Sequence, residues 1–162
     1  MPSTVKEIHL KGKGSYAALV KRNAVLKARD AARRLKDGVV IAADTIAVQD
    51  NKIFGKPKDL QDARRMLKKL SRKPQWLYTG VAVIDVSRNK ALVEYEKTKV
   101  IMVPLGDKQI SRYFRRVTPL DKAGGFDIQG RGAFFIRRIE GCFYNVVGLP
   151  MERLYRMLKK LA

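Results

Sequence analysis

The stretch Val39-Val40-Ile41-Ala42-Ala43-Asp44-Thr45 decides how the rest of the chain is interpreted. Its opening apolar run is short and continuous, which is typical of a strand buried on both faces of a sheet. Asp44 directly follows the run, and ligands of α/β proteins gather at the carboxyl ends of strands. A carboxylate there could bind Mg²⁺ or accept a proton from a water that attacks a phosphate. The alternative is an ordinary strand-end aspartate that accepts hydrogen bonds from turn amides.

Outward from this strand, helical and β patterns alternate along the chain. Apolar residues recur at helical spacing from Ser15, a possible N-cap, to Leu35. Further helices are expected over 59–70, 107–117 and 150–161, and further strands over 46–49, 76–86, 91–103 and 133–139. This order is too irregular for a doubly wound sheet. It predicts an α/β fold, a mixed twisted sheet flanked by helices, in a single domain over residues 1–162.

The chain is strongly basic, with 35 Lys and Arg against 15 Asp and Glu and a formal net charge of +20. Such a field attracts polyanions, whether nucleic acid, an anionic membrane surface or free nucleotides, and does not choose among them. The basic residues are spread along the sequence and form no recognisable module that reads nucleic acid, so no specific nucleic acid is expected as a partner. No apolar run approaches the ~20 residues that span a bilayer, and no membrane association is expected.

The cysteine and histidine content bears on location and chemistry. Cys142 is the single cysteine, and the opening residues contain no apolar signal segment, so we expect a cytoplasmic protein. His9 is the single histidine. This excludes a His-rich metal site and disfavours histidine-based catalysis.

Lys27 is placed unusually for a lysine. It stands seven residues after Val20 and four before Ala31, on the apolar stripe of the first predicted helix. A lysine there either extends its ammonium outward to solvent or points into a cleft where it meets an anion.

The stretch from Asp121 to Gly132 is rich in glycine and carries Lys122, Gln129 and Arg131. Glycines allow the backbone to approach a ligand closely, and a glutamine amide can read a base edge with its donor and acceptor groups. An irregular connecting loop is the alternative, but a loop of this length with amide and cationic groups favours a functional site. Gly55-Lys56-Pro57 places a further lysine where it could contact phosphate.

Several short blocks, taken in order, resemble the Maf-like family of nucleoside triphosphate pyrophosphatases. Lys27-Ala28 stands seventeen residues before Asp44, as the family's Lys-Ala does. The other blocks are Val40-Ile41-Ala42-Ala43-Asp44-Thr45, Gly55-Lys56-Pro57, Tyr78-Thr79-Gly80-Val81, Pro119-Leu120-Asp121-Lys122-Ala123-Gly124, Ile128-Gln129-Gly130-Arg131-Gly132-Ala133 and Asn145-Val146-Val147-Gly148-Leu149-Pro150. The Asp-Thr pair together with Ile-Gln-Gly is similar to the subgroup that acts on dTTP and UTP.

This resemblance implies a fold similar to that of inosine triphosphate pyrophosphatases and a homodimer. It also implies a metal-dependent hydrolase that cuts a nucleoside triphosphate between its α- and β-phosphates, giving a monophosphate and pyrophosphate. By the same resemblance, Asp44 accepts the proton of the attacking water. Glu7 joins Asp44 at a divalent cation, Mg²⁺ or Mn²⁺.

The resemblance also assigns the residues that bind substrate. Thr45 and Gln129 help to choose the base, and Lys27, Lys56 and Lys122 bind phosphates.

One feature of the family is missing from the sequence. The family opens with a strand and a Ser-Pro-Arg-Arg turn that cradles the triphosphate, and no Ser-Pro-Arg-Arg occurs here. We therefore expect an N-terminally truncated chain whose activity is impaired. The alternative to an enzyme is a catalytically impaired Maf-like protein that binds nucleotides or regulates cell division. A nucleic-acid-binding protein ranks last, with only weak binding that salt abolishes.

Overall fold

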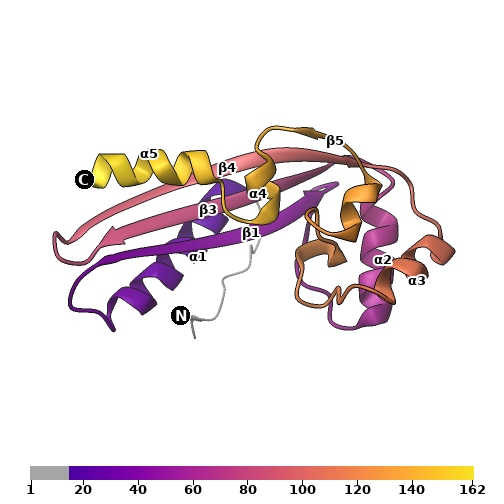
Figure 1. Ribbon diagram of the computed structural model, residues 1–162, viewed down its shortest axis with the longest axis horizontal. Coiled ribbons are helices and arrows are strands. Elements are labelled where there is room, and N and C mark those ends of the chain that lie inside the picture. The colour runs from indigo at the N-terminus through magenta and orange to yellow at the C-terminus, as the bar shows by residue number, and fades with distance from the viewer. Residues whose placement is uncertain (1–14) are drawn as a thin grey trace. The chain divides into compact units, whose positions relative to one another are not determined.

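A computed structural model describes residues 15–162 and shows helices together with one five-stranded sheet (Figure 1). The helices are α1 (Tyr16–Ala32), α2 (Leu60–Leu70), α3 (Asp107–Phe114), α4 (Phe143–Val147) and α5 (Met151–Leu161). The strands are β1 (Val39–Gln49), β2 (Lys52–Phe54), β3 (Gln75–Asp85), β4 (Lys90–Met102) and β5 (Ile136–Glu140), and 3₁₀ turns lie at η1 (Ala123–Gly125) and η2 (Arg131–Phe135). The strand order is β2-β1-β3-β4-β5, and β1–β2 and β4–β5 pair antiparallel. The predicted α/β class with helices flanking a sheet is confirmed.

The internal contacts divide the chain into two compact units. The first contains the described residues up to Thr45 together with Tyr78–Glu96 and Gly148–Ala162. The second contains Ile46–Leu77 and Lys97–Val147. That residues 1–162 form a single domain stays a prediction.

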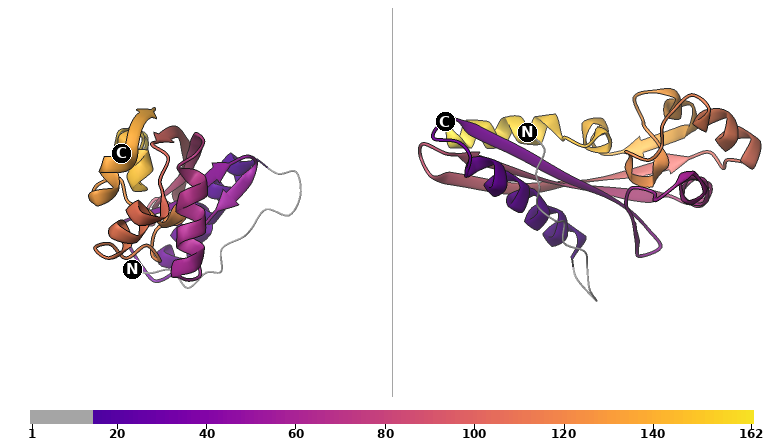
Figure 2. Two further views of the ribbon diagram at one scale, coloured as in Figure 1. Left: turned by 90° about the vertical axis from the view of Figure 1, so that its right-hand side faces the viewer. Right: turned by 90° about the horizontal axis from the view of Figure 1, so that it is seen from below.

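In the first unit, α1 and α5 cover opposite faces of the sheet. Helix α1 packs on Val40 of β1 and Ala82 of β3, whereas α5 packs on Val81 and Val83 of β3. Successive side chains of a strand point to opposite faces, so the two helices must lie on different sides. Figure 2 shows α1 and α5 on the two sides of these strands.

The first helix begins as its sequence predicts and approaches the sheet closely. Ser15 caps it, with its hydroxyl oxygen accepting from the amide of Ala18 at 3.4 Å. The helix ends at Ala32, three residues before the predicted Leu35. At Gly80, β3 lies so close to α1 that a Cβ would overlap the backbone of Val20.

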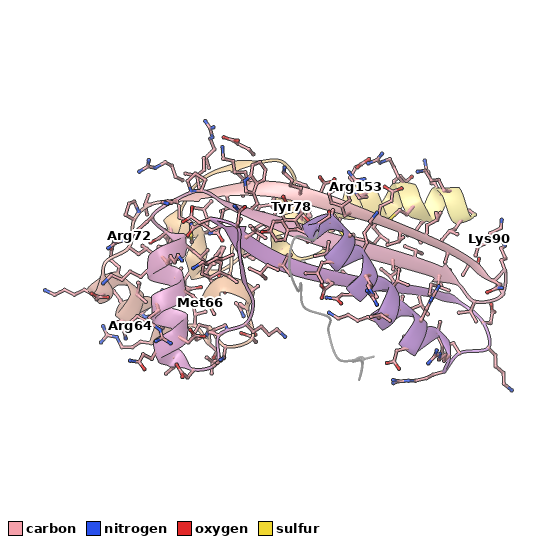
Figure 3. All side chains as sticks on the ribbon, turned by 180° about the vertical axis from the view of Figure 1, so that it is seen from behind. Arg64, Met66, Arg72, Tyr78, Lys90 and Arg153 are labelled. Carbon is pink, nitrogen blue, oxygen red and sulfur yellow. The ribbon has the colours of Figure 1, made fainter. Side chains whose placement is uncertain are left out.

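The second unit has its own apolar core beneath α2 and α3. Its buried residues include Leu67, Leu70, Ile110, Tyr113 and Phe126. Asp59 caps α2, as predicted, by accepting from the amide of Asp62 at 2.7 Å. The guanidinium of Arg64, labelled in Figure 3, donates to Ser111 Oγ at 2.6 Å and so links α2 to α3.

Two expectations about the strand before Asp44 are wrong. The stretches 39–43 and 46–49 are one continuous strand, β1, because neither Asp44 nor Thr45 interrupts the extended backbone. Burial on both faces also fails, because Val39 and Ile41 are 50% and 43% exposed while Val40 is buried. Only the side of this segment that faces α1 is covered.

Two short elements, strand β2 and helix α4, were not predicted from the sequence. Strand β2 and helix α4 are each too short to show a period in the sequence. From Ser15 onwards, no helix combines the length and the apolar composition needed to cross a bilayer.

Candidate active site

Asp44 is a buried carboxylate held by two side chains of one helix. It lies in β1 with 5% of its surface exposed. The amide nitrogen of Asn23 donates to Asp44 Oδ2 at 3.1 Å, and the ammonium of Lys27 donates to Oδ1 at 2.6 Å. Asn23 and Lys27 are one helical turn apart on α1, so both reach the same point of the strand.

The position of Lys27 answers the alternatives that its sequence context left open. Its side chain is 22% exposed, and its ammonium bonds to the carboxylate of Asp44. The lysine therefore points inward to an anion, and that anion belongs to the protein itself. Its partly exposed side chain leaves the ammonium within reach of solvent and of an incoming ligand.

Small residues allow α1 to lie close enough to β1 and β3 for these contacts. Ala24 and Ala28, which flank the two polar residues on the helix, are fully buried. Gly80 provides the corresponding space on β3. Any side chain at Gly80 would push α1 outward and move Asn23 and Lys27 away from Asp44.

Thr45 lies on the other face of β1. Its Oγ1 is 2.9 Å from Thr79 Oγ1 of β3 and 3.5 Å from the carbonyl oxygen of Gly148. Adjacent strand residues point to opposite faces, so Thr45 and Asp44 do not meet. The neighbouring Tyr78, labelled in Figure 3, packs against Tyr16 of α1 in a tilted ring contact with centroids 5.6 Å apart, on the face that carries Asp44.

In the second unit, two predicted phosphate-binding lysines share the neighbourhood of one carboxylate. Lys122 Nζ lies 3.0 Å from both oxygens of Asp121. The hydrogen bond from Lys122, aided by the charge of Lys56, lowers the pKa of the Asp121 carboxyl. The loops that carry these lysines are joined because the Gly124 amide donates to the Gly55 carbonyl oxygen at 3.0 Å. The structure therefore brings Lys56 and Lys122 together.

The glycine-rich loop is organised around Asp127. Its Oδ1 accepts from the amides of Gly130 and Gly132 at 3.1 and 3.4 Å. A Cβ at Gly132 would overlap the backbone carbonyl of Asp127, so this position requires glycine, and a Cβ at Gly130 would crowd the Asp127 carboxylate. Gln129 sits at the exposed tip of this turn, while Ile128 beside it is buried. The loop is thus internally fixed and presents the glutamine outward.

The predicted site residues fall into two groups. Asp44 and Lys27 meet in the first unit, whereas Gln129 and the two lysines belong to the second. Glu7 lies outside the described residues. Within residues 15–162, no three His, Cys, Asp or Glu side chains gather as a metal-binding group.

Sequence reasoning missed Asn23, which holds the second oxygen of Asp44. Its signal was present, because Asn23 lies four residues before Lys27 on the same apolar stripe. Two polar residues at this spacing on a buried helix face indicate a shared polar partner. Asn23 is only 3% exposed, so a partner is required.

A buried carboxylate paired with lysine, in an α/β fold with the motif order above, points to one family. A family model described as Maf-like protein matches residues 1–161, and the chain belongs to this family. The dTTP/UTP pyrophosphatase of Carboxydothermus hydrogenoformans is 46% identical over 134 residues, which are 83% of this chain and 72% of that protein. The dTTP/UTP pyrophosphatase of Ruminiclostridium cellulolyticum is 40% identical over 161 residues, which are 99% of this chain and 83% of that protein. The resemblance seen in the motifs is confirmed.

Proposed function

We propose that the protein hydrolyses nucleoside triphosphates between the α- and β-phosphates, with dTTP or UTP as preferred substrates. Membership of the Maf-like family supports this assignment. Relatives at 40–46% identity are named dTTP/UTP pyrophosphatases. The observation that carries it within the molecule is the buried Asp44 carboxylate with the Lys27 ammonium 2.6 Å away. A proton acceptor and a cation suited to phosphate lie at one point of the first unit.

In the proposed reaction, the oxygen of water bonds to the α-phosphorus while the bond from that phosphorus to the α–β bridging oxygen breaks. Asp44 accepts the proton that the water loses, and the bridging oxygen leaves with its electron pair as part of pyrophosphate. Asn23 and Lys27 each bind one carboxylate oxygen, and a carboxylate offers about four lone-pair sites. Both oxygens therefore keep a position that can accept the proton. A positioned general base contributes about 10²–10⁴-fold to the rate.

The lysines neutralise the triphosphate in this proposal. Lys27 is partly exposed, so its ammonium can turn from Asp44 to an incoming phosphate. This movement would free one oxygen of the carboxylate as the substrate binds. Lys56 is exposed and Lys122 half-buried, and both stay predicted phosphate contacts by family resemblance. Positioned cations stabilise the charge that develops on the leaving pyrophosphate.

A divalent cation, Mg²⁺ or Mn²⁺, is compatible with the carboxylate that is present. Mg²⁺ is usually held by one or two carboxylates together with substrate phosphates and waters, rather than by a full protein cage. Asp44 has lone pairs beyond those that Asn23 and Lys27 occupy. Asp44 would therefore hold the cation, with Glu7 as a second ligand by family resemblance. When bound, the cation supplies further neutralisation of the phosphate charge.

For the choice of base we propose Gln129 as the main reader. Its amide carries both donor and acceptor groups and is exposed at the tip of an internally fixed loop. Thr45 stays a predicted contributor. Its hydroxyl contacts Thr79 on the face of β1 opposite Asp44. Thr45 could therefore affect base choice only by shifting the backbone of β1.

The test is steady-state release of pyrophosphate from dTTP, UTP and ATP with Mg²⁺ or Mn²⁺. We expect faster release from dTTP or UTP than from ATP, and a drop of about 10²-fold or more in kcat for Asp44→Asn. Asp50→Asn is the matched control, because Asp50 directly follows β1 and also pairs with a lysine, but at an exposed position. That control should change kcat by less than about twofold. Lys56→Ala should raise KM more than it lowers kcat.

The outcomes separate an enzyme from a nucleotide-binding or regulatory protein. Release of orthophosphate, equal rates for all triphosphates, or an active Asp44→Asn variant would contradict the proposed reaction. Binding of UTP without hydrolysis, measured by calorimetry, would favour the catalytically impaired alternative. A homodimer and a cytoplasmic location remain part of the proposal, and sedimentation analysis tests the first of them.

A further inference from the structure

A pocket of about 300 Å³ opens in the second unit beside α3, among residues to which the proposed hydrolysis gives no role. Its walls come from α3, the turn that follows it, and η2. The residues that matter here are Arg112, Tyr113, Arg116, Arg131, Phe134 and Phe135. A volume of this size is at the lower end of the range, about 300–1,000 Å³, for pockets that bind small molecules.

The pocket is cationic and has no acidic wall. Arg112, Arg116 and Arg131 all line it, and no Asp or Glu does. Over the described residues, no hydrogen bond or ion pair engages any of the three guanidinium groups. The acidic residues on the flanking segments have other partners, since Asp107 bonds to Lys68, Asp121 to Lys122 and Asp127 to loop amides. The three arginines are therefore available to an anion from solution.

The pocket lining also contains three aromatic side chains, those of Tyr113, Phe134 and Phe135. Phe134 is 84% exposed, which is unusual for so large an apolar side chain. The rings of Tyr113 and Phe135 meet edge to face with centroids 4.9 Å apart. The Tyr113 hydroxyl oxygen also accepts from the amide of Asp127 at 3.0 Å. Burial raises the pKa of Tyr113 to about 12, so the phenol stays neutral and does not oppose an anion.

We propose that this pocket binds a nucleoside monophosphate, with its phosphate on the arginines and its base against Phe134. The planar guanidinium fork matches the geometry of phosphate oxygens. Aromatic side chains stack on every base, which gives binding with little base preference. A phosphate alone would leave Phe134 uncovered, and a purely apolar ligand would leave the charges of the three arginines without a counterion. The site takes no part in catalysis at Asp44, so it adds a second nucleotide-binding function to the proposed one.

The experiment titrates AMP into the 162-residue protein and follows the amide NMR signals of α3 and of Gly132. AMP is chosen because it is not a product of the preferred dTTP or UTP reaction. Salt is held at about 0.1 M, where the Debye length is about 10 Å and the diffuse field of the basic surface is largely screened. Adenosine and inorganic phosphate are titrated in parallel. We expect AMP to bind more tightly than either.

Substitutions then locate the contacts. Arg112→Ala and Arg116→Ala should each weaken AMP binding by about tenfold. Arg115→Ala is the matched control, because Arg115 lies between them in sequence, is also exposed and does not line the pocket. It should weaken binding by less than about twofold. Phe134→Ala should weaken AMP but leave the affinity for inorganic phosphate unchanged.

Three results would overturn the proposal. An equal loss for Arg115→Ala would mean that only the diffuse positive field attracts AMP. No effect of Phe134→Ala on AMP would mean that the pocket reads phosphate without a base. Signal changes confined to α1 would mean that AMP binds at Asp44 instead. None of these measurements involves turnover, so a negative result would reject this binding site without bearing on the proposed hydrolysis.

Discussion

Removing the ammonium of Lys27 should destabilise the protein more than neutralising Asp44 does, although both changes break the same ion pair. The reason is the unequal burial of the partners, because the side chain of Lys27 is 22% exposed and that of Asp44 only 4%. After Asp44→Asn, the lysine can still reach water. After Lys27→Met, the carboxylate stays buried, and the amide of Asn23 is its remaining side-chain donor among residues 15–162.

The size of each effect follows from what is left behind. Breaking a buried pair by removing one partner costs about 3–5 kcal/mol. The partial exposure of Lys27 reduces this, so we expect Lys27→Met to lower the free energy of unfolding by about 2–3 kcal/mol. In Asp44→Asn the new amide can accept from Lys27, and it can donate to Asn23 once the Asn23 amide rotates by a half turn. The loss in unfolding free energy should therefore be about 1 kcal/mol or less. For a chain of this size the first change corresponds to a fall in Tm of about 5–10 °C.

The measurement is urea-induced unfolding of the variants at neutral pH, analysed by linear extrapolation. The double variant Lys27→Met/Asp44→Asn should be more stable than Lys27→Met alone, because it no longer buries an uncompensated charge. Two results would refute the reasoning. One is an equal loss from both single changes, and the other is a double variant whose loss is the sum of the two.

The structure makes further predictions that the same preparations can test. Gly80→Ala should lower the unfolding free energy by about 1–3 kcal/mol or more, because its Cβ would overlap Val20 of α1, whereas Gly55→Ala meets no atom within 4 Å and should leave it nearly unchanged. Glu94→Gln should destabilise the protein at neutral pH. The hydrogen bonds from Lys160 and then Arg153 lower the pKa of Glu94 below its ordinary 4.5, so the difference from the unmodified protein should shrink as pH falls through the lowered value. Thr45→Val should lower the unfolding free energy by about 1 kcal/mol through loss of its bond to Thr79, and the ratio of dTTP to ATP turnover in the same variant shows whether Thr45 also affects base choice.

Local sequence signals predicted most of the secondary structure. Ser15 and Asp59 are N-caps as expected. A short polar side chain just before a helical apolar pattern is well placed to accept from the free amides of the first turn. The long β runs became β3 and β4 with only small changes at their ends. The prediction of two separate strands in place of β1 was wrong. Burial, and not composition, decides whether a polar pair such as Asp44-Thr45 interrupts a strand.

The candidate site was predictable in its residues but not in its contacts. Asp44 and Lys27 could be selected from strand position and helix stripe, yet neither signal states that one binds the other. That pairing depends on how closely α1 approaches the sheet, which is set by Gly80 and the alanines beside Lys27. Close approach of this kind leaves no period in a sequence, whereas Asn23 could have been found from its spacing to Lys27 on the same helix stripe.

The adjacent residues Asp44 and Thr45 connect segments that are far apart in the sequence, and the alternation of strand side chains explains how. Asp44 faces α1 and accepts hydrogen bonds from two polar side chains of that helix. Thr45 faces the other way and contacts Thr79 of β3 and the carbonyl oxygen of Gly148 just before α5. A short sequence motif therefore fixes both faces of the first unit at once, one by a charge pair and one by hydroxyl contacts. Because the two side chains do not meet, a substitution at Thr45 can alter Asp44 only by moving the backbone of β1.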